Sequence, residues 1–503
     1  MFNSPGKQSI IRILISIAGS IIGTLSTLFV YPLNMSLHGL AMFILTTSLM
    51  FTPFLLFGSG AVAINNYQEF RTDDRKDNGF LSVIFSMYLF GSALFALVFF
   101  FGGEWFSTFF HSGKTEYNKY FAYILPLTIL QAGCALIDVY LNNFTKVIIP
   151  AIFKEFLLKL TLPLLIGLHV LGYISVETVM IGLLGNYLLA LIMLLIYTFY
   201  LRRHSFAINF KFLNPERVKR ITNYAFFAIL GAFGSQMVNY LDIVMIKAIL
   251  PPLEYISVYS MHYNLANFIN MPTIAIIAVA GPLVARYISE KNDDKLEHIY
   301  ASSSTIMLLL GCFLTAGIMI NIESIYGLMS NGDAYRPGIM VLVYLSIAKL
   351  FDMATGLNSQ IIGYSKHYKV NFYTVISLGV LNAGLNLILI YKLGISGAAL
   401  ATLISMTLFN VFKLWFVKKK FGIWPFTMKD LYIILITLFL GLMAYFIPAG
   451  SDYYLQIAIR SSIFTILFWA IAIRFDFSPQ ITLYYRNVAN RVRKMGTGNS
   501  GNN

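Results

Sequence analysis

The chain has 503 residues, of which 58% are hydrophobic and 12% charged, and its mean hydropathy is +0.72. A water-soluble domain carries about 25% charged residues, so this composition excludes a soluble globular fold. The formal net charge of +14 would suggest nucleic acid as the partner of a soluble protein, but the positions of the charges lead to a different explanation.

Fourteen hydrophobic stretches, each of about 18–27 residues, follow one another with almost no polar sequence between them. A run of about 20 apolar residues, coiled as an α-helix, crosses the ~30 Å hydrocarbon core, and in lipid the backbone must satisfy its own hydrogen bonds. We therefore expect an all-α polytopic membrane protein of about 14 transmembrane helices. The expected spans are 10–33, 38–63, 80–102, 120–142, 147–172, 177–200, 222–249, 256–281, 300–322, 338–362, 370–391, 396–417, 431–448 and 457–474.

The 36 Lys and Arg residues are unevenly divided between the two sides of these spans. With the amino terminus inside, 26 lie in cytoplasmic segments, six lie within spans and four lie outside. The four external ones are Lys114, Lys119, Arg336 and Lys392. An excess of Lys and Arg marks cytoplasmic loops, so we expect both termini in the cytoplasm, membrane lipids as partners and no nucleic acid.

A faint internal repeat relates the two halves of the chain. Residues 37–43, at the start of the second span, correspond to 253–259 at the start of the eighth, and 171–175 correspond to 393–396. Six spans separate the equivalents, so both copies have the same orientation and form a parallel pseudo-repeat about an axis along the membrane normal. The expected parts are an N-terminal six-helix lobe at 1–201, a basic cytoplasmic linker at 202–221, a C-terminal six-helix lobe at 222–420, a terminal helix pair at 421–474 and a cytoplasmic tail at 475–503.

The loops between spans are too short for a catalytic domain. The longest external loop, residues 103–119, has about 17 residues, and the chain lacks a G-x-x-x-x-G-K-[ST] phosphate loop. These features disfavour a membrane-embedded enzyme of glycan assembly and a fused ATPase. We expect a transporter that is not an enzyme and uses no cofactor.

Several motifs carry a resemblance to a known family. They lie at residues 223–225, 239–242, 363–366, 382–390 and 393–402. There the chain resembles the polysaccharide-exporter and Wzx-type O-antigen flippase branch of the multidrug/oligosaccharidyl-lipid/polysaccharide exporter superfamily, and the resemblance covers nearly the whole chain.

The resemblance implies a fold and a function. The fold would be two six-helix lobes around a cavity that opens alternately to each side. The function would be movement of an undecaprenyl-diphosphate-linked oligosaccharide across the bacterial cytoplasmic (inner) membrane. The implied partners are this lipid-linked substrate, a coupling H⁺ or Na⁺, and glycan polymerases.

Ionisable residues within spans are costly, so each is a candidate functional residue. Lys154 and Lys159 lie roughly 12 and 20 Å along the fifth span at 1.5 Å per residue. We expect at least one of them to bind the diphosphate of the substrate, and the alternative is structural pairing with an acid such as Glu155. Arg12 begins the first span, where a headgroup would enter, although the positive-inside rule also explains it.

Acidic residues within spans are the candidate ion-coupling sites. Lys349 and Asp352 are spaced i,i+3 in the tenth span and form either a structural pair or a protonatable one that contacts substrate. Asp138 and Asp242 are isolated acids in the fourth and seventh spans. Each is a candidate proton or cation site, and the alternatives are pairing across the bundle or exposure near a helix end.

Asn382 and Asn386 lie on one face of the eleventh span at i,i+4. They are candidates for sugar binding, with hydrogen bonding between helices as the alternative. Lys247, Lys413 and Arg460 lie close enough to span ends to snorkel toward water, so we expect them to have no part in the site.

Other functions compete with the flippase interpretation. A cation-coupled multidrug exporter of the same superfamily would stop at twelve helices and favour an acidic cavity. Here basic residues outnumber acids within the spans, and an extra helix pair is present. A scaffold for glycan assembly is the remaining alternative. The excess of basic over acidic residues within the spans favours an anionic, lipid-attached substrate.

The charge bias predicts the sidedness of both halves. Reporters fused at Asn503 or after Arg203 are expected to read as cytoplasmic, because the basic segments around both sites resist translocation. A fusion at Lys114 is the external control. An external signal at Asn503 or Arg203 contradicts the span count.

Overall fold

The computed structural model describes residues 5–72, 77–102, 116–144, 146, 148–201, 212–448, 450–483 and 487. Within these ranges every regular element is helical and no strand occurs. Thirteen helical segments among the described residues are long and apolar enough to cross a membrane. The expectation of an all-α polytopic fold is confirmed, and the chain is a multi-pass membrane protein.

The described backbone separates into two compact units. The first contains Met1–Asn264, Met329–Leu342 and Phe372–Ser405, and the second contains Leu265–Leu328, Val343–Asn371 and Met406–Asn503. The pseudo-repeat of two six-helix lobes stays a prediction. The first half of the predicted linker at 202–221 and most of the predicted tail at 475–503 lie outside the described residues.

The helices from the amino terminus to the middle of the chain are α1 (Pro5–Phe29), η1 (Tyr31–Leu33), α2 (Met35–Leu56), α3 (Ser59–Asn65), α4 (Tyr67–Phe70), η2 (Asp77–Gly79), α5 (Phe80–Phe101), η3 (Glu116–Tyr123), α7 (Ile124–Asn142), α8 (Ile148–Ile152), η4 (Phe153–Leu157), α9 (Leu158–Val170), α10 (Val176–Tyr200) and α11 (Pro215–Ile249). Those that follow are α12 (Glu254–Ile269), α13 (Met271–Ser289), α14 (Asp293–Met319), α15 (Ile322–Leu328), η5 (Gly332–Ala334), η6 (Arg336–Gly338), α16 (Ile339–Ala354), α17 (Asn358–Tyr364), α18 (Lys369–Leu393), α19 (Ile395–Phe421), α20 (Met428–Tyr445) and α21 (Tyr453–Arg474).

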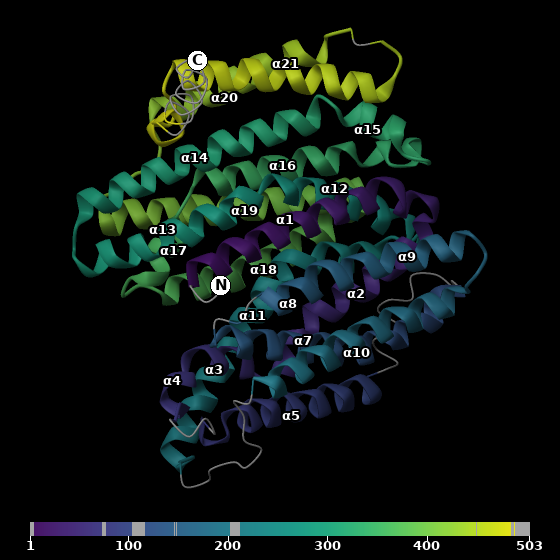
Figure 1. Cartoon of the computed structure of the whole chain (residues 1–503), viewed down its shortest axis with the longest axis vertical. Helices are drawn as coiled ribbons and strands as arrows, with labels where there is room; N and C mark the ends of the chain where they lie inside the picture. The colour runs from purple at the N-terminus through teal and green to yellow at the C-terminus, as the bar shows by residue number, and fades with distance from the viewer. Residues whose placement is uncertain are drawn as a thin grey trace, which may run out of the picture. The chain divides into compact units, whose positions relative to one another are not determined.

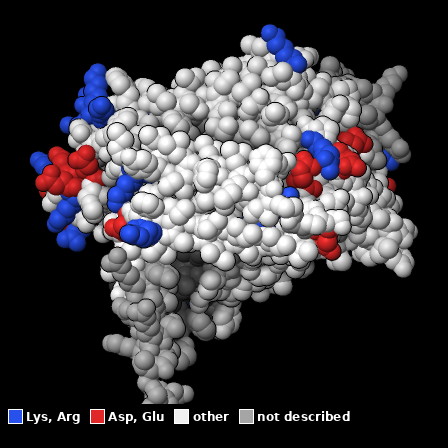
Figure 2. All heavy atoms as spheres, turned by 90° about the horizontal axis from the view of Figure 1, so that it is seen from above, with Lys and Arg blue, Asp and Glu red and all other residues white. Residues whose placement is uncertain are grey.

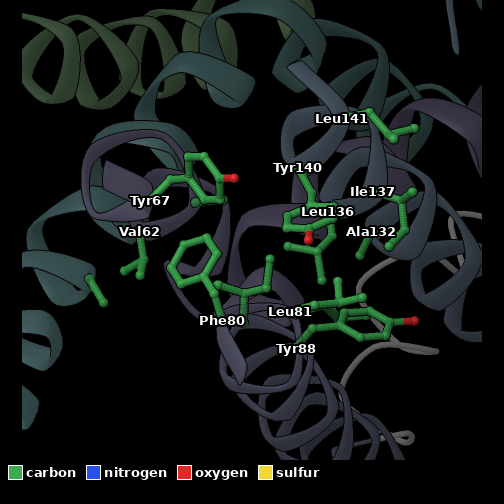
Figure 3. Close-up of a cluster of buried hydrophobic side chains, with 14 of the residues drawn as sticks. Val62, Tyr67, Phe80, Leu81, Tyr88, Ala132, Leu136, Ile137, Tyr140 and Leu141 are labelled. Atoms are coloured by element: carbon green, nitrogen blue, oxygen red, sulfur yellow. The ribbon is translucent and has the colours of Figure 1, made fainter. Parts of the chain in front are cut away.

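Helix α2 is central to the first unit, because α5, α7 and α11 all pack against it. Figure 1 shows α5, α7 and α10 lying side by side in this unit. Buried side chains of α3, α4, α5 and α7 form its main apolar cluster (Figure 3), in which the rings of Tyr67, Phe80 and Tyr140 meet. At the edge of the cluster the Tyr67 hydroxyl donates to Asp77 at 3.0 Å. Close packing of this kind holds helices together in a membrane. Lipid tails are themselves apolar, so an apolar side chain gains little free energy merely by moving from lipid into the protein interior.

Two apolar clusters hold the second unit together. One joins α14, α16, α20 and α21, so the predicted terminal helix pair packs against α14. The other joins α13, α14, α17 and α19. On the face that Figure 2 shows, charged side chains gather toward two sides, and the surface between them is almost free of charge. That pattern suits a helix bundle with an apolar belt.

Four predicted spans are interrupted in the structure. The second breaks between α2 and α3, and the eighth breaks between α12 and α13. The fifth, expected as one helix over 147–172, consists of α8, a π-helical turn at Phe153–Leu157 and α9. The tenth, expected over 338–362, ends as α16 at Ala354 and resumes as α17 at Asn358. Between them Gly356 has φ +63°, and a Cβ added there would overlap the Ser304 hydroxyl. Only glycine fits this turn without strain, and apolar composition alone does not reveal such breaks.

Candidate functional site

A buried polar network surrounds Asp242 in the first unit. Tyr259 of α12 and Thr402 of α19 each donate a hydroxyl hydrogen bond to Asp242 Oδ2 at 2.5 Å. From α18, the Asn386 amide donates to Asp242 Oδ1 at 2.8 Å. The carboxyl group is buried and receives donors from three helices. A polar group buried within a membrane protein requires hydrogen-bond partners of this kind.

A second layer of hydrogen bonds orients these donors. The Asn386 amide also donates to Asn382 Oδ1 at 2.7 Å, and the Asn382 amide donates to Thr402 Oγ1 at 3.0 Å. The i,i+4 spacing of the two asparagines places both on one face of α18, toward Asp242. The structure thus brings together residues to which the sequence assigned two different roles, ion coupling and substrate binding. Tyr259 and Thr402 were missed, although Thr402 ends one of the motifs that carry the family resemblance.

The donors to Asp242 are all neutral groups, so they do not balance its negative charge. Asn386 Oδ1 is buried and has no donor among the described residues. Buried charges are normally paired or bound to a cation, and carboxylate, amide and hydroxyl oxygens are the ligands of hard cations. This arrangement is able to hold a proton or a small monovalent cation.

A half-buried ion pair lies where α1 meets the fifth span. Lys159 Nζ is 2.5 Å from Glu155 Oε2, and their side chains are 36% and 14% exposed. The Ser16 hydroxyl of α1 donates to Glu155 Oε1 at 3.4 Å. Glu155 belongs to the π-helical turn, a feature common at functional positions. Lys159 is therefore paired with the acid that the sequence offered as its alternative partner.

Three further sequence candidates lie in the first unit. Lys154 is exposed on the π-helical turn. Arg12 of α1 donates to the side-chain oxygen of Asn142 at 3.4 Å, which joins α1 to α7. Asp138 is half-buried on α7.

A second polar network lies in the second unit, beside the break between α16 and α17. Asp352 accepts from the Asn410 amide at 3.0 Å, and Lys413 donates to the Ser359 hydroxyl at 2.7 Å. The Lys413 ammonium also lies 3.8 Å from the centre of the Phe409 ring. Lys349, half-buried, lies one turn before Asp352 on α16.

Two lysines contradict the expectation that they snorkel to water. Lys413 is only 2% exposed and Lys247 is fully buried. The Lys247 ammonium donates to the Pro251 carbonyl at 3.3 Å and lies 5.8 Å from the centre of the Phe121 ring. The expectation was wrong because hydroxyl, carbonyl and aromatic partners inside the bundle replace water. Distance from a span end, which was the only signal in the sequence, does not show such partners.

An apolar cavity of about 450 Å³ lies between α14, α16 and α20 in the second unit. Leu308, Ala316, Leu350, Phe351, Leu438 and Tyr445 are among the residues that line it. Thr315 and Thr437 supply the few polar groups. Sequence reasoning missed this cavity, because an apolar cavity wall and a lipid-facing helix surface have the same composition.

Comparison with known proteins yields one curated relative, and no family model matches. The relative is a probable low-salt glycan biosynthesis flippase, Agl15, of Haloferax volcanii, 23% identical over 197 residues. The match covers 39% of this chain and 41% of that protein, so the chain spans less than half the length of this relative.

Solved structures match over most of the chain. The lipid II flippase MurJ, in an inward closed conformation, superposes with a TM-score of 0.71 at 18% identity. That match covers 92% of this chain and 99% of the other. An inward-facing multidrug resistance MATE family transporter of the MOP superfamily gives a TM-score of 0.62 at 12% identity, covering 82% and 98%. At sequence identities of 18% and 12%, the structural similarity shows a shared fold.

The burial of Lys413 leads to a testable prediction. Lys413→Ala is expected to lower the free energy of unfolding by about 2–4 kcal/mol, because it removes a buried hydrogen bond and leaves a cavity. Thermal unfolding of the purified protein in detergent measures the loss. Lys392→Ala, at an exposed position, is the matched control and should leave the melting temperature unchanged. Equal stability of the two variants would mean that Lys413 reaches water.

Proposed function

The chain has the fold of the multidrug/oligosaccharidyl-lipid/polysaccharide exporter superfamily, and from that premise we propose that it is a flippase for a lipid-linked oligosaccharide. The substrate is an undecaprenyl-diphosphate-linked glycan, which the protein moves across the bacterial cytoplasmic membrane by alternating access. No covalent bond changes, so the protein is not an enzyme, and both termini lie in the cytoplasm. O-antigen assembly, with glycan polymerases as partners, is the finer form of this proposal.

The apolar cavity against α20 is the observation that carries the proposal. Its lining is almost wholly apolar, so it suits a hydrocarbon chain better than a soluble drug, which needs polar groups to fix its orientation. α20 belongs to the helix pair that follows the two predicted six-helix lobes. A polyprenyl tail that rests there would keep its apolar length out of water while the headgroup moves.

The headgroup of such a substrate carries a diphosphate, which needs countercharge. We assign this role to Lys154, Lys159 and Lys349, with Arg12 at the point of entry. Lys154 is exposed, and Lys159 is held near α1 by Glu155. Phosphate oxygens accept charge-assisted hydrogen bonds from lysine, so the Lys159 ammonium exchanges Glu155 for the diphosphate during passage.

The Asp242 network is the proposed coupling-ion site. A cation bound there would balance the Asp242 charge and would take Asn386 Oδ1 as a further ligand. Asp138 and Asp352 are secondary candidates.

A cation-coupled multidrug exporter is the second candidate function. The likeness to the MATE transporter and the buried Asp242 network favour it. Substrate distinguishes the two candidates, because a flippase moves a lipid-linked glycan and an exporter moves a soluble cationic drug.

Flipping in proteoliposomes tests the proposed function. The probe is an undecaprenyl-diphosphate disaccharide with a fluorescent sugar, and chemical quenching from outside reports its transfer. A Lys154→Ala/Lys159→Ala/Lys349→Ala variant is expected to flip the probe at least roughly tenfold more slowly, since the loss of even one charge-assisted bond costs about 1.5–3 kcal/mol. Lys159→Arg should retain part of the activity.

The matched control removes the same charge from exposed positions, as Lys291→Ala/Lys366→Ala/Lys392→Ala. It should flip at the rate of the unmodified protein. Normal flipping by the well-folded first variant refutes the role of the lysines. If Lys159 is structural instead, Lys159→Ala lowers stability and Glu155→Ala added to it restores stability. Absence of flipping by the unmodified protein, with transport of a cationic drug, favours the second function.

The coupling-ion proposal predicts stabilisation by sodium. Raising Na⁺ at constant ionic strength should raise the melting temperature, because an ion that binds the folded state at about 100 times its Kd adds about 2.7 kcal/mol. Asp242→Asn should abolish the shift, and Asp138→Asn should keep it. A shift that survives Asp242→Asn places the ion elsewhere, and a shift absent from the unmodified protein leaves the proton as the ligand.

A further inference from the structure

The two segments that the internal repeat relates contact each other in the first unit. The residues of α2 involved are Ser36, His38 and Gly39, and those of the α12 start are Leu253, Glu254 and Ser257; we call this contact the α2–α12 seam. A Cβ added to Gly39 would overlap the Leu253 carbonyl oxygen, so the backbones meet directly. The Ser36 hydroxyl donates to Glu254. The seam is closed in this structure.

His38 is the titratable group at the middle of the seam. Its ring is fully buried, and Nδ1 lies 2.7 Å from the Ser257 hydroxyl oxygen. The same hydroxyl lies 2.9 Å from that of Tyr335, between α15 and α16. The Tyr31 ring stacks on the imidazole with a centroid distance of 4.0 Å. The ring is thus held on one face and at one nitrogen.

The other nitrogen of His38 has no partner. Nε2 is buried and makes no hydrogen bond to any described residue. A neutral imidazole has one N–H donor, whereas the cation has two. The cation would therefore bury a charged N–H without an acceptor at Nε2, which is far more costly than the neutral ring. The closed seam accommodates neutral His38 only.

Among the described residues, no acid forms a hydrogen bond or ion pair with the His38 ring. The titratable or charged groups on the surrounding elements are Tyr31 of η1, Lys247 of α11, Glu254 of α12, and Asp333, Tyr335 and Arg336 between α15 and α16. Glu254 accepts from Ser36, and Asp333 pairs with Arg336 at 2.9 Å on the protein surface. Lys247 donates to Pro251. Within the described part of the chain, the hydrogen bond of the His38 ring goes to Ser257 alone.

We propose that His38 is a proton-binding site that releases the α2–α12 seam. This inference rests on the proposed alternating access, in which the seam closes one side of the transport path. Once protonated, the ring needs water or an acceptor at Nε2, and parting of the two helix starts supplies water. The charge bias assigns this end to the external side, so protons from outside favour the outward-open state.

The coupling follows from linkage. A proton that binds the open state more tightly than the closed state shifts the population toward the open state. One titrating group changes the ratio of open to closed protein by at most about tenfold per pH unit. Histidine ordinarily titrates near pH 6.5, so the open state accumulates below neutral pH.

Distance measurements between two spin labels test the proposal. The labels are attached at Leu33→Cys and Tyr255→Cys, two exposed positions that flank the seam, after Cys134→Ser and Cys312→Ser remove the native thiols. The full chain is placed in lipid nanodiscs at about pH 8 and about pH 5.5. We expect one short distance at the higher pH and a second, longer population at the lower pH.

His38→Gln should keep the short distance at both pH values, because the amide stays neutral and still bonds Ser257. His38→Asn serves in its place if His38→Gln does not fold. His298→Gln, at an exposed position on α14 of the second unit, is the control that keeps the response. Distances that do not change with pH in the unmodified protein overturn the proposal. So does a response that survives in the folded His38 variant or disappears in His262→Gln alone, since His262, on α12, is also buried.

The spin-label experiment contains no substrate, so it separates this inference from the proposed function. Flipping of the undecaprenyl probe without a pH-dependent distance refutes the His38 site and leaves the flippase proposal standing. A pH-dependent distance without flipping of the probe supports the His38 site and refutes the flippase proposal. The rate of flipping against pH adds a second criterion, because His38→Gln should flatten that profile.

Discussion

The cost of leaving a polar group unsatisfied in lipid governs the arrangement of this protein. A charge buried among the helices needs partners that the fold itself supplies. Asp242 has three neutral donors, Lys159 has Glu155, and Lys413 has a hydroxyl and an aromatic ring. Glu155 and Phe409 are local partners. Asn386, Thr402 and Ser359 come from helices distant in sequence, and they hold α11 to α18 and α19, and α17 to α19.

The irregular backbone lies next to these polar groups. The π-helical turn of the fifth span carries Lys154 and Glu155, and the break after α16 lies between Asp352 and Ser359. A transporter that alternates between two states needs helices that change direction, and irregular backbone at membrane depth is tolerated where protein surrounds it. The proposed function uses both features, since Lys154 lies on the π-helical turn and Asp352 lies just before the break after α16.

The sequence predicted the fold well because apolar run length is a direct consequence of bilayer thickness. It also found Asp242, Asn382 and Asn386, since polar residues in a span are conspicuous. It could not place them in one network, because contacts between helices depend on rotation and packing that the spacing along one helix does not reveal. Lys413 shows the same limit, because its burial depends on its contacts with Ser359 and Phe409. The apolar cavity and the unpartnered His38 nitrogen left no compositional signal.

A structure of the protein in nanodiscs with an undecaprenyl-diphosphate-linked oligosaccharide, determined by cryo-electron microscopy, is the most direct test of the central claim. The account predicts density for the polyprenyl chain in the cavity between α14, α16 and α20, and a diphosphate in contact with Lys154, Lys159 or Lys349. An empty cavity with the glycolipid bound only at the outer surface of the bundle would contradict it.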